Sequence, residues 1–353
     1  MELELKNVAI YAQGEAGCNI MNTLIDLYGT DTFRFIVSDT NKDTLNSVAK
    51  GADKIQLGEG VGAGIDPKVA EQFVTRQAFK DELTKKLEGV DVCFCVAGLG
   101  GGTGSAISKA IEHIRSMGIA VYCIATTPFA FELQHESIRQ ANTDYAVSEI
   151  KKQSICYQLF DNEILVEKFG DLSPFSAFRK SDVQVAQCLE AILEIIKTRA
   201  FPNIDINDIK RFLTHAKGEA LFNVGEGSTL AESMANAQDM SYLTHRNFKR
   251  ITGLISMSTG NDENVTMGEM SKELNQLSQK LAVGAVNKSG MGRSKDDKIY
   301  TYILIGGLDN NEETIDAKQA LTIEQRIKAL RTDNIKQPKA PTTKPELGAR
   351  KAL

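Results

Sequence analysis

Apolar residues in the first half of the chain alternate between short β-branched runs and helical patterns. Runs at residues 8–11, 33–37, 92–96 and 120–125 predict buried strands, and the pattern over 20–27 predicts a helix after the first of them. Strands that alternate with helices indicate a parallel sheet covered by helices on both faces. Ligands of such sheets bind in the loops at the carboxyl ends of the strands, so chemistry is expected there.

The second half begins with a longer helical pattern. Residues 173–200 carry apolar side chains at helical spacing, and Pro202 ends the pattern. Strand-like runs at 251–257 and 300–305 then enclose a helical pattern near 267–281, which predicts a smaller α+β unit. The apolar positions of the long helix are Phe178, Val185, Cys188, Leu189, Ile192, Ile195 and Ile196.

These patterns divide the chain into four parts. We expect an α/β domain with a Rossmann-like parallel sheet over residues 1–174, a central helix over 175–200 and a smaller α+β domain over 201–310. Residues 311–353 follow as a C-terminal helix and tail, and from about residue 331 they are rich in Pro, Lys and Thr. This composition lacks core-forming residues and predicts a disordered, mildly basic tail.

Composition and charge exclude several classes of protein. With 42% hydrophobic and 25% charged residues, the chain is neither fibrous nor wholly disordered. The first ten residues do not resemble a signal peptide, and no apolar stretch approaches the roughly 18 residues that span a bilayer, so we expect a cytoplasmic protein without membrane insertion. A net charge of -5 argues against a general nucleic-acid binder.

Cysteines and histidines give no sign of a metal site. The six cysteines lie mostly within apolar runs and form no CxxC pair, which predicts buried, reduced thiols. The four histidines have no partner at i, i+4, so a zinc site is not expected. The histidines are His113, His135, His215 and His245.

A glycine-rich loop joins the strand at 92–96 to a helix, and it is the most informative segment. The helix presents Ile107, Ile111 and Ile114 on one face. Glycines leave successive backbone N–H groups unobstructed, so they can close around phosphate oxygens at the helix start. Thr103 or Ser105 is expected to cap the helix or contact a phosphate. The glycines are Gly98, Gly100, Gly101, Gly102 and Gly104.

Two other readings of this loop are weaker. A Walker P-loop requires a lysine before the Ser or Thr, and the loop has none. A purely structural turn would hardly use so many glycines, because each costs roughly 0.5–1 kcal/mol in a regular element. Phosphate binding is therefore preferred.

The segment GGGTGS at residues 100–105 resembles the signature loop of tubulins and of bacterial and archaeal FtsZ proteins. Three further stretches resemble FtsZ in the same order, namely KIQLGEGVGAGIDP at 54–67, TTPFAFE at 126–132 and NIDINDIKRF at 203–212. The resemblance covers roughly residues 5–308. It implies a GTP-binding domain over 1–174 that is joined by the central helix to an activation domain over 201–310.

The resemblance assigns residues to a guanine nucleotide. It implies that GTP or GDP is held by the signature loop and by the first strand-to-helix turn, which here reads GEAGCN. A magnesium ion that bridges the phosphates is expected from the charge of the nucleotide. The implied phosphate and sugar contacts are Gly14, Ala16, Gly17, Cys18, Asn19, Gly100, Gly101, Gly102, Thr103, Gly104, Ser105 and Pro128.

The same resemblance places Glu132 at the ribose, whereas Glu136 stands where the family usually has an arginine. Arg139 is a candidate to restore the missing positive charge. No asparagine at the start of the long helix matches the one that recognises guanine. Asp182 is therefore expected to accept the N1 and N2 hydrogens of guanine, with Phe178 stacked on the ring.

Asn203, Asp205 and Asp208 are the candidate catalytic residues. Taken alone, two acids three residues apart at a helix start indicate an N-cap and a solvated turn. NxDxxD after the central helix also resembles the synergy loop of FtsZ, which implies that these acids enter the nucleotide site of the next subunit and orient the attacking water. Hydrolysis would then depend on head-to-tail assembly into filaments.

Several functions remain open. The resemblance implies a GTPase that polymerises for cell division, whereas related filaments position phage or plasmid DNA, and a non-hydrolysing structural filament is a further alternative. The tail is expected to bind a membrane-anchoring or regulatory protein, or to be a solvated terminus. An NAD-dependent oxidoreductase is a remote alternative, because a glycine turn after the first strand and Asp39 after the second partly match a Rossmann fingerprint. Ala12 stands where that fingerprint needs a glycine.

Overall fold

The computed structural model describes residues 7–30, 33–48, 51–153, 155–170, 172–239, 251–261 and 265–308. The predicted C-terminal helix and tail, residues 311–353, lie outside the described residues. Within the described part, no helix is both long enough and apolar enough to cross a membrane.

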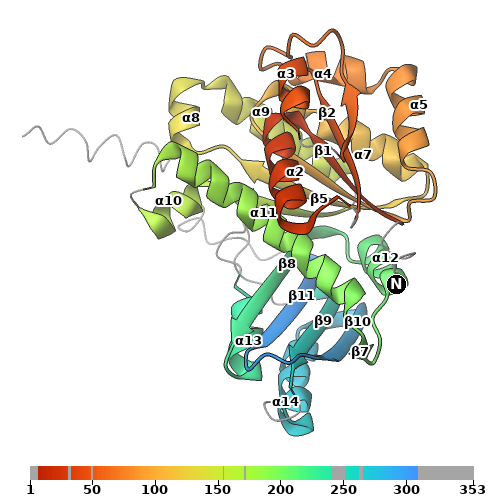
Figure 1. Cartoon of the computed structure of the whole chain (residues 1–353), viewed down its shortest axis with the longest axis vertical. Coiled ribbons are helices and arrows are strands. Elements are labelled where there is room, and N and C mark those ends of the chain that lie inside the picture. The colour runs from red at the N-terminus through yellow and green to blue at the C-terminus, as the bar shows by residue number, and fades with distance from the viewer. Residues whose placement is uncertain are drawn as a thin grey trace, which may run out of the picture. The chain divides into compact units, whose positions relative to one another are not determined.

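The first half of the chain folds into the parallel sheet that its apolar runs predict (Figure 1). Six strands pair in parallel in the order β3-β2-β1-β4-β5-β6, and β1 has its six residues fully buried because helices cover both faces. The strands are β1 (Val8–Gln13), β2 (Arg34–Asp39), β3 (Asp53–Gln56), β4 (Val92–Gly98), β5 (Ala120–Thr127) and β6 (Cys156–Asp161).

Alternate residues of β1 show how the two faces are covered. Ile10 packs in one core with residues of α2 and α11, whereas Tyr11 packs in a second core with residues of α5, α7 and α9. The helices of this half are α2 (Gly14–Tyr28), α3 (Lys42–Ser47), α4 (Pro67–Val74), α5 (Gln77–Lys86), α6 (Gly102–Ser105), α7 (Ile107–Ser116), α8 (Ala130–His135), α9 (Ile138–Lys152), α10 (Glu163–Phe169) and α11 (Pro174–Lys197).

The second half extends the same sheet. β6 pairs in parallel with β8 at Cys156↔Gly218 and Tyr157↔Glu219, and the order continues as β8-β11-β9-β10-β7 to give eleven strands among the described residues. The two expected domains are therefore bridged by backbone pairing. The elements are β7 (Ala200–Phe201), α12 (Ile206–His215), β8 (Gly218–Gly227), α13 (Leu230–Ala237), β9 (Ile251–Gly260), α14 (Met267–Ser278), β10 (Leu281–Arg293) and β11 (Ile299–Gly306).

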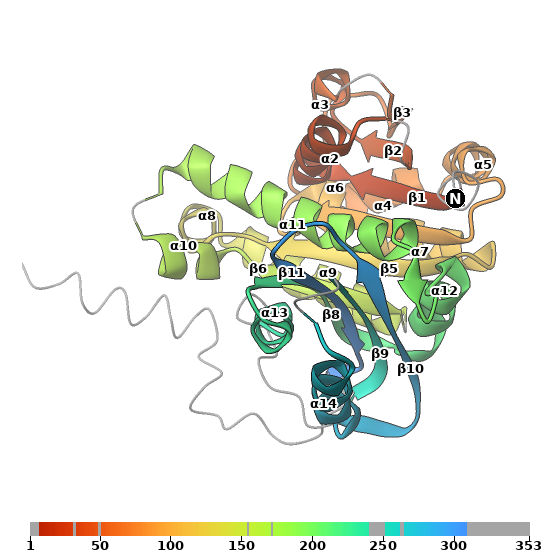
Figure 2. The same cartoon turned by 60° about the horizontal axis from the view of Figure 1, so that its bottom comes forward.

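The central helix α11 links the two halves. Ser173 caps its first turn, Pro174 occupies the position where a missing N–H costs nothing, and Leu189 and Ile192 are fully buried. The helix packs on α2 of the first half and on β8 of the second (Figure 2). Its 24 residues span about 36 Å from end to end.

Candidate functional site

Loops that follow different strands meet at the carboxyl edge of the parallel sheet. Gln13 at the end of β1 donates a 2.6 Å hydrogen bond from Nε2 to the carbonyl oxygen of Thr103, and the Thr103 hydroxyl lies 2.7 Å from that of Thr40, just after β2. The N–H of Leu99 donates to the carbonyl oxygen of Thr126 on β5. The signature loop is therefore fixed by its neighbours on both sides.

Four of the five glycines of this loop are packed against the chain itself. A Cβ on Gly104 would lie 2.1 Å from the carbonyl oxygen of Gly98, and one on Gly102 would lie 2.9 Å from Cβ of Ala63. Gly100 adopts φ +94°, and a Cβ there would lie 2.5 Å from Cγ of Pro128. These glycines shape the loop by permitting close approach of the backbone.

Gly101 differs from the other four glycines. A Cβ at this position meets no heavy atom within 4 Å, so this part of the loop borders open space. Its backbone is extended, with φ -82° and ψ 177°, and it is the N-cap of α6 without a side-chain cap. A phosphate can therefore approach the main chain here without displacing any side chain.

The side chains of Thr103 and Ser105 do not cap a helix, which corrects one of the two expectations for them. The Ser105 hydroxyl accepts a 3.0 Å hydrogen bond from the N–H of Gly100, inside the loop. The Thr103 hydroxyl contacts Thr40. Ser105 thus braces the loop from within, and Thr103 ties it to the segment after β2.

The first strand-to-helix turn lies directly against the signature loop. Gly14 adopts φ +85°, and a Cβ there would lie 2.8 Å from the backbone nitrogen of Gly104. A Cβ on Gly98 would lie 2.5 Å from that of Ala16, and one on Gly17 would lie 3.1 Å from a backbone oxygen of β4. The two loops that the resemblance assigns to the phosphates are thus adjacent in space.

Cys18 and Asn19 take different positions on α2. The Cys18 side chain is fully buried in the core below the sheet edge, and burial raises the pKa of its thiol to about 12. Only its main chain is available to a nucleotide. Asn19 is exposed.

A buried polar network supports the loop, and the sequence did not predict it. The Tyr11 hydroxyl donates to Oε1 of Gln13 at 2.7 Å and lies 2.6 Å from the Ser38 hydroxyl. Burial raises the pKa of the neighbouring Asp39 carboxyl to about 6, and the negative charge of Glu15 adds to the shift. The sequence did contain one indication of this network: the buried strands β1 and β2 end in polar residues, Gln13 and Ser38-Asp39, although a buried strand is expected to be apolar throughout.

Glu132 and Arg139 lie beside the same loop. Oε2 of Glu132 accepts a 3.0 Å hydrogen bond from the N–H of Phe129, and Arg139 forms ion pairs with Glu136 and, at 4.0 Å, with Glu132. Cβ of Arg139 is 3.5 Å from the position that a Cβ on Gly100 would occupy. The base of the Arg139 side chain therefore lies against the loop, while its guanidinium is paired with Glu132 and Glu136.

Asn142 was missed at the sequence level. Its Nδ2 donates to the carbonyl oxygens of Gly100, at 3.0 Å, and Ile65, at 2.7 Å. It ties the signature loop to the segment at 54–67 that also resembles FtsZ. The sequence offered one indication of this role, an asparagine in the middle of a helix, where its propensity is poor.

The start of α11 brings aromatic and acidic side chains to this edge. Phe178 packs edge to face on Phe129, with ring centroids 5.0 Å apart, and part of its ring remains exposed. Asp182 follows one turn later, and burial raises the pKa of its carboxyl to about 7. Asn162, just after β6, accepts a 2.7 Å hydrogen bond from the Ser181 hydroxyl and is a further polar group of the edge that the sequence did not reveal.

The three candidate catalytic residues lie at the entry to α12, with Asn203 two residues before the N-cap. Asp205 is its N-cap, because its Oδ1 accepts hydrogen bonds from the N–H groups of Asn207 and Asp208 at 2.9 and 3.1 Å. Asp208 Oδ2 in turn accepts the N–H of Asp205 at 3.2 Å. Asn203 is exposed, and both acids are half-buried. The capping role that the spacing indicates is thus present, and the side chains also reach the surface.

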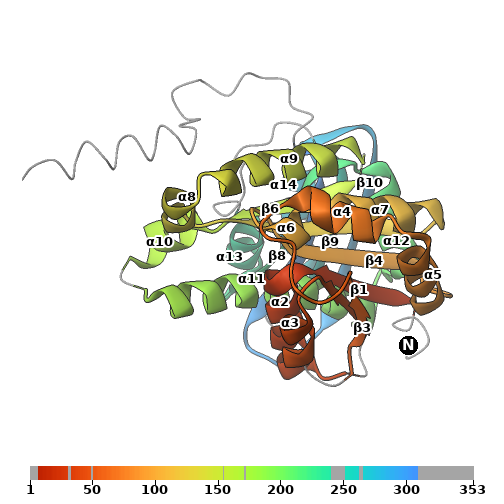
Figure 3. The same cartoon turned by 90° about the horizontal axis from the view of Figure 1, so that it is seen from above.

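These acids lie at the amino ends of the parallel strands, opposite the carboxyl ends where the glycine loop lies. Lys210 on α12 pairs at 2.7 Å with Asp91, which precedes β4, whereas the glycine loop begins at the other end of β4. The seven residues of that strand extend over about 20 Å. In Figures 1 to 3, α8 and α10 stay on the left and α12 on the right. The predicted residues therefore form two groups, one at each edge.

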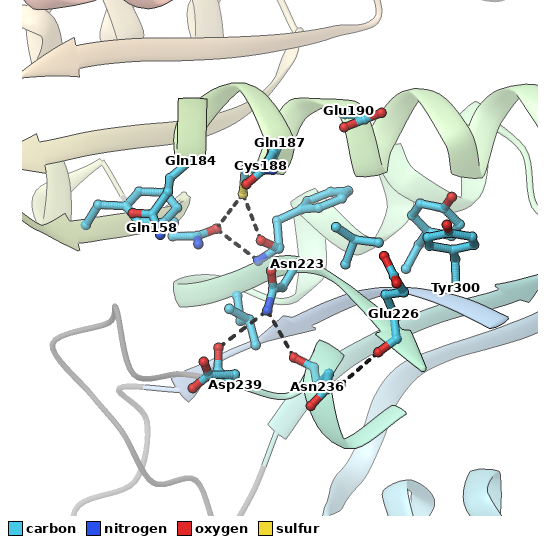
Figure 4. Close-up of a pocket in the computed structure, with 15 residues that line it drawn as sticks. Gln158, Gln184, Gln187, Cys188, Glu190, Asn223, Glu226, Asn236, Asp239 and Tyr300 are labelled. Atoms are coloured by element: carbon cyan, nitrogen blue, oxygen red, sulfur yellow. Dashed lines mark hydrogen bonds between the residues drawn. The ribbon is translucent and has the colours of Figure 1, made fainter. Parts of the chain in front are cut away.

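A cavity of about 470 Å³ lies between α11 and the strands β8 and β11, and none of the residues predicted to bind nucleotide or to act in catalysis lines it (Figure 4). Gln158 and Cys188 lie on one side of it and Asn223, Glu226 and Tyr300 on the other. Oε1 of Gln158 accepts hydrogen bonds from the Tyr122 hydroxyl, the Phe222 N–H and the Cys188 thiol. This polar centre holds α11 to the sheet where its two halves join.

Comparisons with known proteins agree with this architecture. Residues 7–170 match the family model described as Tubulin/FtsZ family, GTPase domain. Cell division protein FtsZ 1 of Pyrococcus woesei is 31% identical over 237 residues, which are 65% of this chain and 62% of that protein. The match thus spans less than two thirds of that relative's length.

Solved structures show the same fold. A mutant FtsZ of M. jannaschii superposes with a TM-score of 0.74 at 21% identity and covers 88% of this chain and 93% of that one. CetZ2 from Haloferax volcanii, solved as a GTPγS-bound protofilament, gives a TM-score of 0.71 at 15% identity over 93% and 99% of the two chains. Residues 7–170 of this chain therefore match the GTPase domain of the tubulin/FtsZ family, and the chain carries the fold of the FtsZ and CetZ2 structures.

Proposed function

We propose that this chain binds GTP or GDP at the carboxyl edge of its parallel sheet and hydrolyses GTP only when it assembles head to tail. One observation carries the proposal: the glycine loop and the acids of α12 lie at opposite ends of the parallel strands, so that they are separated by the length of the sheet. Neither group can complete the other within one chain. Two chains in line bring the acid loop of one, residues 203–208, to the glycine loop of the other.

The carboxyl edge fits a guanine nucleotide. The open main chain at Gly101 offers N–H groups to phosphate oxygens, and Arg139, now paired with Glu132 and Glu136, is the cation beside the loop that could turn to them. Phe178 offers an exposed ring surface to the base, and Asp182 as a carboxylate accepts the two hydrogens on the guanine edge. Magnesium, held by phosphate oxygens and by an oxygen ligand such as Asp208 of the next chain, would neutralise phosphate charge.

The acid loop fits the remaining task. Asp205 and Asp208 are held in fixed orientation by their reciprocal N-terminal hydrogen bonds, and Asn203 is exposed beside them. Placed against a neighbouring nucleotide, these side chains orient water in line with the γ-phosphate, which is a large part of catalysis in phosphoryl transfer. A head-to-tail contact uses two different surfaces and extends into an open filament unless it closes.

The biological role proposed for this filament is cell division in the cytoplasm, as in the FtsZ relatives, with phage or plasmid positioning as the alternative. Residues 311–353 are the segment proposed to bind a membrane-anchoring or regulatory protein. A non-hydrolysing filament is the second candidate, because Glu15 lies exposed beside the first turn and Glu136 replaces a positive charge near the loop.

Mixed assembly of two inactive variants tests the proposal. Asp208→Ala keeps the nucleotide site and loses the acid, whereas Gly101→Val keeps the acid and loses the nucleotide. Each alone is expected to release little phosphate, while an equimolar mixture regains activity at up to roughly a quarter of its interfaces. Wild-type turnover that rises steeply with protein concentration is the matching result.

Two outcomes would refute the proposal. Turnover per chain that does not change with protein concentration would place the whole active site in one molecule. GTP binding and assembly without phosphate release from wild-type protein would establish the non-hydrolysing alternative. Binding of a nicotinamide dinucleotide, measured by calorimetry, would instead revive the oxidoreductase reading.

A further inference from the structure

Strand β10 is the surface on which the acid loop rests. It pairs with β7 at Met291↔Phe201 and Gly292↔Ala200, immediately before the loop begins. A Cβ on Gly290 would lie 2.5 Å from the carbonyl oxygen of Pro202. The chain from 200 to 204 therefore lies directly on the bare backbone of β10, which fixes the path into α12.

Lys288 lies on the same face of β10, two residues before Gly290. Its ammonium nitrogen is 3.2 Å from Oδ2 of Asp208, and the Lys288 and Asp208 side chains are 34% and 23% exposed. The same oxygen accepts the N–H of Asp205 at 3.2 Å. Two donors from different elements thus hold one carboxylate oxygen, which restricts rotation of the Asp208 side chain.

The charge of Lys288 is as relevant as its geometry. Asp205 and Asp208 carry two negative charges within one helical turn, and assembly brings them toward a triphosphate that is itself anionic. The ammonium group of Lys288, paired with Asp208, reduces this repulsion and remains beside the acid loop when the interface forms. A partly buried pair of this kind is screened less by salt than a surface pair.

We infer that Lys288 is the positioning residue of the acid loop: it holds Asp208 in the orientation in which the carboxylate acts on the neighbouring chain's nucleotide. This inference rests on the proposed function. It predicts that Lys288 affects hydrolysis only through Asp208 and has no influence on nucleotide binding by the isolated chain, because the nucleotide site is at the other edge of the sheet.

Three variants test this role. Lys288→Met removes the charge and keeps the length of the side chain, Lys288→Arg retains the charge, and Lys210→Met is the matched control. Lys210 is a partly exposed lysine of α12 itself, and it pairs with Asp91 rather than with an acid of the loop. Phosphate release is measured at saturating GTP and divided by the amount of assembled protein, alongside the GDP affinity of the unassembled chain and the unfolding temperature.

Lys288→Met is expected to lower turnover per assembled chain by about tenfold or more, with GDP affinity unchanged. Lys288→Arg is expected to restore turnover to within about threefold of wild type, and Lys210→Met to stay within about twofold. Turnover that is unchanged in Lys288→Met, or reduced equally in Lys210→Met, would overturn the inference. A lower unfolding temperature with normal turnover would show that Lys288 is only structural.

Adding Lys288→Met to Asp208→Ala separates positioning from direct contact with substrate. A positioning residue has nothing left to position in that background, so no further loss of turnover is expected. An additional loss would mean that Lys288 acts on the nucleotide itself. If wild-type turnover does not depend on assembly, the proposed function fails first and the inference falls with it. If wild type and Asp208→Ala behave as proposed while Lys288→Met is active, only the inference fails.

Discussion

The proposed contact between Asp182 and the guanine base makes the affinity for guanine nucleotides depend on pH, in a direction that follows from the pKa of Asp182. Burial raises the pKa of its carboxyl to about 7. Guanine presents hydrogen-bond donors on its N1 and N2 edge, so the binding form of Asp182 is the carboxylate. Below pH 7 the carboxyl must lose its proton before the base binds. Affinity is therefore expected to fall as the pH is lowered.

The size of this effect follows from the pKa. Titration of a single group multiplies the apparent Kd by one plus ten to the power of pKa minus pH, which gives about 1.1 at pH 8, about 2 at pH 7 and about 11 at pH 6. Each further unit of acidity costs about 1.4 kcal/mol. The isosteric change Asp182→Asn removes the titration and is expected to weaken binding at pH 8 by about 10- to 100-fold, the worth of hydrogen bonds to a charged group.

GDP binding by the unassembled chain is the appropriate assay, because hydrolysis and filament formation do not contribute. Phosphate groups also titrate near pH 6, and so does Asp39, but both remain in Asp182→Asn. The ratio of wild-type to variant Kd across pH 5.5 to 8 therefore isolates Asp182. Calorimetry in two buffers with different ionisation enthalpies is expected to show release of nearly one proton per GDP at pH 6, and none from this group in the variant.

A ratio of Kd values that does not change with pH would refute the assignment of Asp182 to the base. Uptake of protons on binding would refute it as well, because it would mean that the protonated carboxyl is the binding form. Either result leaves the phosphate loop untouched, since its groups are main-chain amides that do not titrate.

Two other predictions concern the edge that holds the glycine loop. Gly101→Val is expected to abolish nucleotide binding and to leave the free energy of unfolding within about 0.5 kcal/mol of wild type. Gly104→Ala places its Cβ 2.1 Å from a carbonyl oxygen and should lower that free energy by about 1–3 kcal/mol or more. Denaturant unfolding and GDP titration distinguish the two variants, and equal destabilisation would contradict the reasoning. Because the pKa of Asp39 is raised to about 6, the folded chain binds more protons than the unfolded chain between about pH 4 and 6, and its stability falls as the pH rises through that range. Asp39→Asn should therefore raise the free energy of unfolding by up to about 3 kcal/mol at pH 7.5 and by little at pH 4. An increase of the same size at both pH values would exclude titration of Asp39 as the cause.

The sequence predicted the parallel sheet well because its strands are buried on both faces. Such strands read as unbroken apolar runs, as in VCFCV at residues 92–96, and they are punctuated by glycine loops. No feature of the sequence indicates the pairing between β6 and β8. Only two residue pairs make that junction, and contacts between positions some 60 residues apart leave no local periodicity to read.

The sequence predicted where the candidate site lies but not the role of each of its residues. Glycine content indicated a phosphate loop, but sequence cannot tell that Gly104 is glycine for packing while Gly101 borders open space. Cys18 could have been excluded as a side-chain ligand, because it shares a buried helical face with Met21 and Ile25. Gln13 was not foreseeable as a brace, since it meets Thr103 across 90 positions of chain.

The polarity of the sheet has a consequence for how activity should grow with filament length. Because the parallel strands all end on one side, each chain of the proposed filament has one proposed nucleotide site and one acid loop, which face opposite ways along the filament axis. An open filament of n chains then has n minus one complete sites, and turnover per chain rises as (n−1)/n. A dimer already reaches half of the limiting value, so activity should approach its plateau while filaments are still short. If turnover per chain instead keeps rising with filament length well beyond a few subunits, contacts between filaments, rather than the joining of the two ends alone, must complete the site.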